Sequence, residues 1–73
     1  MTKVFSLTDI DCPVCAGKVQ DLVSKIDGVK SARVDFLVLK LTIEADEADF
    51  ARIIPLAEKA VKKVEPDCDM IAL

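Results

Sequence analysis

Apolar residues recur along this chain with two alternating periods, and this pattern constrains the fold more than any other feature. A period of two, typical of half-buried strands, covers four short segments, 3–7, 32–36, 39–44 and 68–73. A helical period of apolar residues covers two longer segments, 13–28 and 45–64. The order strand, helix, strand, strand, helix, strand predicts an α+β protein with a ferredoxin-like βαββαβ fold.

Proline and glycine mark the expected ends of these elements. Pro13 suits the first turn of a helix, where its missing N–H costs no hydrogen bond, and Gly28 is expected to cap that helix in a left-handed conformation. Pro55 lies inside the second helical segment, so either it kinks one long helix or the main helix begins there after a short turn. The second and third strands are close enough to form a hairpin that turns near Leu37 and Val38.

The handedness of crossover connections predicts the order and direction of the strands in the sheet. A right-handed crossover makes the first and second strands parallel, with the third strand between them. The fourth strand then joins the free edge of the first. The expected sheet has the order 4-1-3-2 with antiparallel neighbours, and both helices cover one face. In this arrangement residues 65–68 should lie near the loop that follows the first strand, although they are far from it in sequence.

Size and charge restrict the class of protein. The 73 residues leave room for one domain, 1–73. The 13 acidic and 10 basic residues give a net charge of −3, and Trp and Tyr are absent, which argues against a nucleic-acid partner. No apolar run approaches the ~20 residues of a membrane helix, and the first residues lack the apolar stretch of a signal peptide. We therefore expect a cytoplasmic monomer without direct membrane insertion, free-standing or part of a transporter.

Cysteine placement indicates the chemistry. An odd number of cysteines, three, without a secretion signal favours metal or redox chemistry over a disulfide framework. Cys12 and Cys15 lie where a loop meets a helix N-terminus, and the two-residue spacer lets both sulfurs bind one centre. A helix N-terminus favours anions, so both thiols are expected to ionise more readily than ordinary cysteines. Two thiolates suit Cu(I), Zn(II) or Cd(II).

Three stretches of the sequence resemble one family. Residues 10–16, IDCPVCA, resemble the metal loop of the heavy-metal-associated (HMA) domain. The second strand of that family is resembled by residues 28–29, GV, together with residues 32–36, ARVDF. Residues 65–67, EPD, are similar to the end of the amino-terminal domains of bacterial zinc- and cadmium-type P-type ATPases. The resemblance spans nearly the whole chain. It implies a ferredoxin-like fold and a role in metal transport or trafficking.

Carried over residue by residue, the resemblance implies Cys12 and Cys15 as ligands and Ile10 as a buried hydrophobe under the loop. The loop departs from the commonest family pattern, GMTCxxC, because Asp9, Ile10 and Asp11 replace its Gly, Met and Thr. Zn(II) takes about four ligands and accepts carboxylate, whereas Cu(I) is satisfied by two sulfurs. Asp11 is thus a candidate third ligand and a candidate helix cap, and the two roles can combine. Zinc- and cadmium-type relatives also carry an acidic residue there, so we predict Zn(II) or Cd(II), with Cu(I) as the second candidate.

Cys68 has two interpretations. It alternates with Asp67 and Asp69, which predicts a side chain in the core, where cysteine behaves as a small hydrophobe. The expected topology nevertheless brings it near the loop, where a third thiolate would favour cadmium or lead. Cys68 is therefore a candidate metal ligand as well as a candidate core residue.

Two functions fit the cysteine pair. The first is a metal-binding module that passes its ion by ligand exchange to a transporter body or to a partner metal-binding domain, and that is not itself an enzyme. The alternative is a small thiol–disulfide oxidoreductase, because Cys-Pro-Val-Cys after a strand also resembles a glutaredoxin-like active site. The order of the second half, hairpin then helix then strand, differs from the thioredoxin arrangement and favours the first function.

Overall fold

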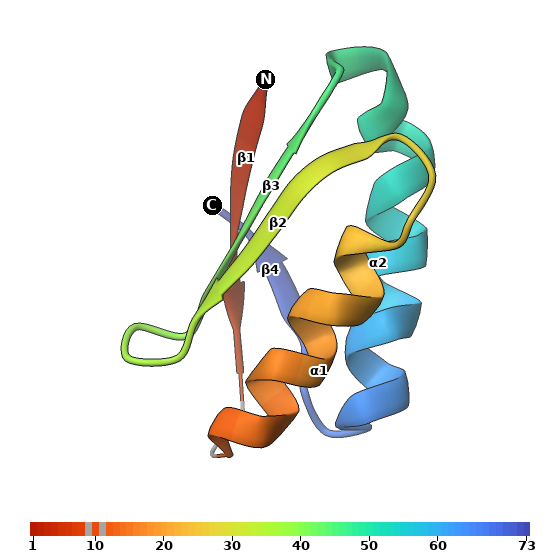
Figure 1. Cartoon of the computed structure of the whole chain (residues 1–73). Coiled ribbons are helices and arrows are strands. Elements are labelled where there is room, and N and C mark those ends of the chain that lie inside the picture. The colour runs from red at the N-terminus through yellow and green to blue at the C-terminus, as the bar shows by residue number, and fades with distance from the viewer. Residues whose placement is uncertain (9, 11) are drawn as a thin grey trace.

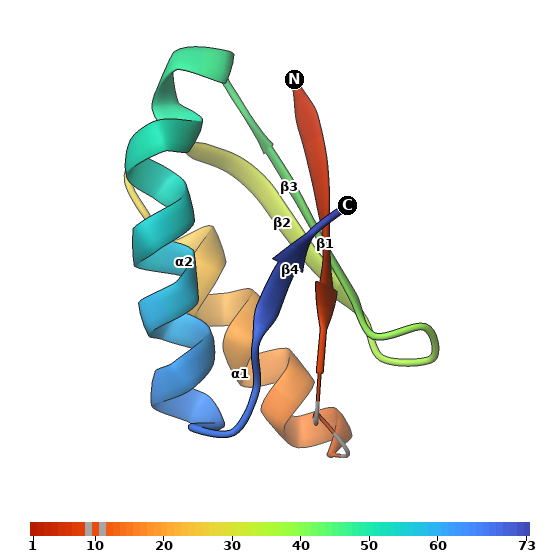
Figure 2. The ribbon, with the colours of Figure 1, turned by 180° about the vertical axis from the view of Figure 1, so that it is seen from behind.

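The computed structural model describes residues 1–8, 10 and 12–73, and its elements follow the expected order. They are β1 (Thr2–Leu7), α1 (Pro13–Ser24), β2 (Val29–Asp35), β3 (Lys40–Ala45), α2 (Phe50–Val64) and β4 (Met70–Ala72), with a short 3₁₀ turn, η1 (Glu47–Asp49), before α2. The strands form one sheet of order β2-β3-β1-β4, antiparallel between all neighbours. Both helices lie on the same side of the sheet, as Figures 1 and 2 show from opposite directions. The predicted ferredoxin-like fold and strand order are confirmed.

The core lies between the sheet and the two helices. Strand alternation sends every second side chain of β1 and β3 inward, so the partners Phe5 and Leu41 are both buried. The helices bury residues at helical spacing against this face: Ala16, Val19 and Val23 from α1, and Phe50, Ile53, Ala57 and Val61 from α2. Each fully buried Val, Leu, Ile or Phe side chain contributes about 1.5–3 kcal/mol. No polar or charged side chain is buried in the part of the chain that the structure describes.

The end of α1 differs from the sequence-based prediction. The helix ends at Ser24, and the amides of Lys25 and Ile26 donate to carbonyls three residues back, which tightens the last turn. Gly28 does adopt a left-handed conformation, with φ of +97°, but in the turn that leads into β2. A Cβ atom at Gly28 would lie 2.6 Å from Nη2 of Arg52, but that atom ends a flexible side chain that can move aside, so the positive φ is what favours glycine at this position. The prediction that Gly28 caps α1 is therefore wrong.

Pro55 lies within α2, which begins at Phe50 and runs through the proline to Val64. Pro55 has no N–H to donate to the carbonyl of Ala51, but both residues are exposed, so water can satisfy that carbonyl. The interpretation in which the helix starts at the proline is thus excluded. The hairpin turn covers residues 36–39, as predicted. No helix of the described residues is long and apolar enough to cross a membrane.

Candidate metal site

Cys12 and Cys15 occupy the first turn of α1. Cys12 is the N-cap residue, with extended backbone angles of φ −127° and ψ 121°, and its carbonyl accepts the N–H of Ala16 at 3.1 Å. Pro13 follows at the start of the helix, as its fixed φ and missing donor favour. The side chain of Cys12 does not cap the helix but is hydrogen-bonded to the thiol of Cys15. Both side chains are half-buried, so the two sulfurs lie together at the protein surface.

The contact between the two sulfurs raises the pKa of the Cys15 thiol above its ordinary value. The main cause is the hydrogen bond with Cys12, which stabilises the neutral thiol, followed by desolvation and by the charges of Cys12 and Glu65. The charge of Lys18 acts in the opposite direction. The sequence-based prediction that both thiols ionise more readily than usual is therefore wrong for Cys15.

Hydrogen bonds tie the start of the cysteine loop to the segment between α2 and β4. The N–H of Thr8 donates to the carbonyl of Asp69 at 3.1 Å, and the N–H of Asp69 donates to Oγ1 of Thr8 at 2.9 Å. Lys62 stabilises the segment between α2 and β4, because its Nζ donates to the Cys68 carbonyl at 3.3 Å and to Oδ1 of Asp69 at 3.0 Å. The expected proximity of these two segments is confirmed. Figure 1 shows both at the same end of the molecule.

The other predicted residues divide into three groups. Ile10 is 3% exposed and belongs to the core, as expected for the hydrophobe under the loop. Cys68 is fully buried in the same core, with its Sγ 3.7 Å from the carbonyl oxygen of Asp69. No group of three or more His, Cys, Asp or Glu side chains able to hold a metal ion occurs among the described residues, so Cys68 is not grouped there with Cys12 and Cys15. Asp9 and Asp11 lie outside the described residues.

A surface groove beside Cys15 was not anticipated from the sequence. It has a volume of about 370 Å³ and lies between α1 and α2, lined by Cys15, Lys18, Asp21, Leu22, Lys63 and Val64. Lys18 and Leu22 follow Cys15 at helical spacings of three and seven, which places them on the same face of α1. The spacing of these residues in the sequence could therefore have indicated the wall of the groove that α1 forms. The contribution of α2 could not be deduced without the way in which the two helices pack.

Comparison with known proteins assigns the family. The model of the heavy-metal-associated domain matches residues 4–68. The chain belongs to the heavy-metal-associated domain family. The domain is 32% identical over 62 residues to the cadmium, zinc and cobalt-transporting ATPase of Bacillus subtilis, a match that covers 85% of this chain and 9% of that protein.

Solved structures agree with this assignment. The N-terminal domain of ZntA in its apo form is 26% identical, with a TM-score of 0.73 and coverage of 99% of this chain and 90% of that one. The N-terminal domain of a potential copper-translocating P-type ATPase from Bacillus subtilis, in its Cu(I)-loaded state, is 24% identical, with a TM-score of 0.77 and coverage of 99% and 88%. The CopZ metallochaperone is 20% identical, with a TM-score of 0.77 and coverage of 97% and 100%.

These comparisons establish a heavy-metal-binding domain similar to those of P-type ATPases and metallochaperones. They do not support the thiol–disulfide oxidoreductase alternative, because the fold that carries the cysteine pair is ferredoxin-like. The chain spans about a tenth of the length of the Bacillus subtilis transporter that it matches.

Proposed function

We propose that this domain binds a soft divalent ion, Zn(II) or Cd(II), through Cys12 and Cys15 and transfers it by ligand exchange. The domain would serve as the soluble metal-binding domain of a metal-transporting P-type ATPase or as a metallochaperone. The observation that carries the proposal is the pair of hydrogen-bonded, half-exposed thiols in the first turn of α1. Two sulfurs in contact are placed to bind one soft ion, and their exposure leaves the ion accessible to a partner.

Ligand exchange follows from this exposure. Both thiols lose their protons when an ion binds, so metal binding replaces the hydrogen bond between Cys12 and Cys15 with two metal–sulfur bonds. A thiolate of the partner can then approach the exposed ion and displace one sulfur at a time. The buried Ile10 and the Thr8–Asp69 bonds hold the base of the loop during this exchange. No covalent bond of a substrate is made or broken.

The preference for a divalent ion rests on Asp11, the acidic residue directly before Cys12. A carboxylate suits Zn(II) or Cd(II) as a third ligand, whereas Cu(I) is satisfied by two sulfurs. The similarity to a cadmium, zinc and cobalt-transporting ATPase supports this choice. The burial of Cys68 favours its interpretation as a core residue. In this proposal the domain is cytoplasmic and monomeric between transfers, and its partner is the transporter body or a second metal-binding domain.

The test is a competition titration of the reduced, metal-free domain with Zn(II), Cd(II) and Cu(I) under anaerobic conditions. We expect Asp11→Asn to weaken binding of Zn(II) and Cd(II) by at least about tenfold, because the loss of a carboxylate ligand should cost no less than the loss of a residue that only orients a ligand, about 10–100-fold. Binding of Cu(I) should be unchanged. Asp67→Asn, which neutralises an exposed carboxylate of the α2–β4 loop, is the matched control and should leave all three affinities unchanged. Equal losses in both variants, or tight binding of Cu(I) alone, would contradict the choice of ion.

A further inference from the structure

The groove between α1 and α2 begins at one of the two proposed metal-binding sulfurs. Cys15 lines it, so a molecule seated there lies next to an ion held by Cys12 and Cys15. The volume of about 370 Å³ lies near the lower limit of small-molecule sites, which suits a ligand no larger than a short peptide. Figure 1 shows the two helices that form its walls lying alongside each other.

The lining of the groove combines an apolar part with charges of both signs. Leu22 and Val64 are the apolar residues, Lys18 and Lys63 carry ammonium groups, and Asp21 carries a carboxylate. The ion pairs of the described residues involve Lys30, Arg52 and Lys62 and leave these two lysines and Asp21 unpaired. The groove therefore offers two ammonium groups and one carboxylate, which complement a ligand that carries both carboxylate and ammonium groups.

We propose that this groove binds a small zwitterionic thiol with carboxylate and ammonium groups, whose sulfur becomes an additional ligand of the ion. The inference rests on the proposed function, because the ion must first be held by Cys12 and Cys15. As the sulfur of the ligand bonds to the ion, its thiol proton passes to the solvent, and nothing is oxidised or reduced. The bound thiol would occupy the accessible side of the ion until a partner's thiolate displaces it.

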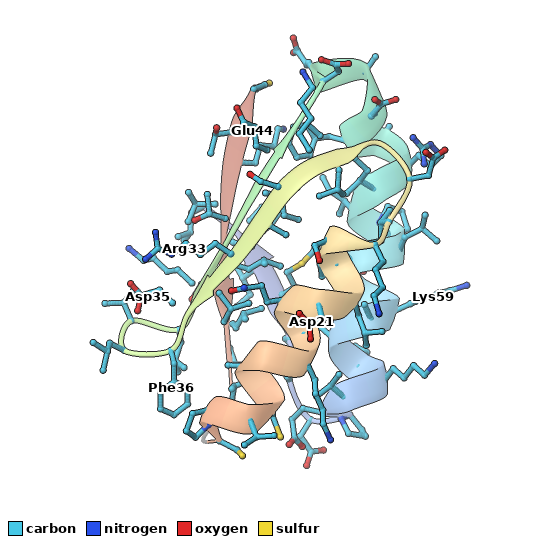
Figure 3. All side chains as sticks on the ribbon, viewed as in Figure 1. Asp21, Arg33, Asp35, Phe36, Glu44 and Lys59 are labelled. Carbon is cyan, nitrogen blue, oxygen red and sulfur yellow. The ribbon has the colours of Figure 1, made fainter. Side chains whose placement is uncertain are left out.

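The first experiment tests the groove without metal. S-methylglutathione carries two carboxylates and one ammonium group but no free thiol, and it would be titrated into the metal-free domain while amide shifts are followed by NMR. We expect saturable shifts at Leu22 and Val64. The variant Lys63→Gln should raise the dissociation constant about two- to fivefold, as for loss of an exposed charge pair. Lys59→Gln is the matched control, since Lys59 extends away from α1 in Figure 3. Absence of groove shifts, or equal effects of the two variants, would overturn the inference.

The second experiment tests coordination. The Cd(II)-loaded domain would be titrated with glutathione and with 2-mercaptoethanol, an uncharged thiol, while the thiolate-to-Cd(II) absorption is recorded. Glutathione should saturate at the lower concentration, and Lys63→Gln but not Lys59→Gln should reduce that advantage about two- to fivefold. Equal preference for the two thiols would overturn the inference. Failure of the cysteine pair to bind metal would appear as no Cd(II) loading at all, whereas the NMR result does not depend on metal.

Discussion

Replacing Cys68 by alanine should destabilise the domain without weakening metal binding. The Cys68 side chain is packed in the core, and 0% of its surface is accessible to solvent. Removing one buried group of about methylene size costs about 0.8 kcal/mol in transfer free energy, and the cavity left behind adds to this. We therefore expect the free energy of unfolding to fall by about 1–2 kcal/mol. In a domain of this size each kcal/mol lowers the melting temperature by about 4–8 °C.

The matched control is Cys12→Ala, which should give the reverse pattern. Cys12 is half-exposed, so its loss should change the stability of the metal-free domain little while removing tight Cd(II) binding. Urea denaturation of the reduced, metal-free proteins measures the first quantity, and competition with a chelator measures the second. If Cys68→Ala kept its stability and lost at least tenfold in Cd(II) affinity, Cys68 would be a ligand and its assignment to the core would be refuted.

Two further predictions concern the supports of the fold. Gly28→Ala should lower the free energy of unfolding by about 1–2 kcal/mol, because alanine is strained at positive φ and its Cβ would meet Arg52. Gly17→Ala, at a helical position with open space around it, should instead raise the free energy of unfolding by about 0.8–1 kcal/mol. Urea denaturation measures both changes, and a change of the same sign in the two variants would contradict this reasoning. The hydrogen bond to Asp69 raises the pKa of Lys62, so its contribution to stability is complete below the ordinary pKa of 10.5 and is lost as pH rises through the raised value. Lys62→Met should therefore flatten part of the alkaline decline in melting temperature, and an unchanged decline would show that the contact contributes nothing.

The period of the apolar residues was sufficient to predict the fold. Alternation in β1 and β3 and the helical stripes of α1 and α2 each indicate which side chains face the core, and the crossover rule then leaves one strand order. The ends of the elements were harder to predict. Gly28 is left-handed as expected, but it lies in the turn into β2, where Arg52, distant in sequence, donates to the carbonyl of the neighbouring Asp27.

The candidate site could be predicted only in part. The CxxC spacing indicated the Cys12–Cys15 pair, and the burial of Ile10 followed from the family resemblance. The raised pKa of Cys15 could not be predicted from the CxxC spacing, because its main cause is a side-chain hydrogen bond with Cys12 that the spacing does not reveal. The groove beside Cys15 was missed for a similar reason, since Lys63 reaches it from a second helix.

The central claim, that Cys12 and Cys15 hold the ion, is tested most directly by X-ray absorption spectroscopy of the Zn(II)-loaded domain. We predict two sulfur neighbours at about 2.3 Å and oxygen neighbours at about 2.0–2.2 Å. Cys12→Ser and Cys15→Ser should each lose one sulfur from this shell, and Cys68→Ala should keep both. A shell without sulfur, or one that is the same in the Cys12→Ser and Cys15→Ser variants as in the unmodified domain, would contradict the account.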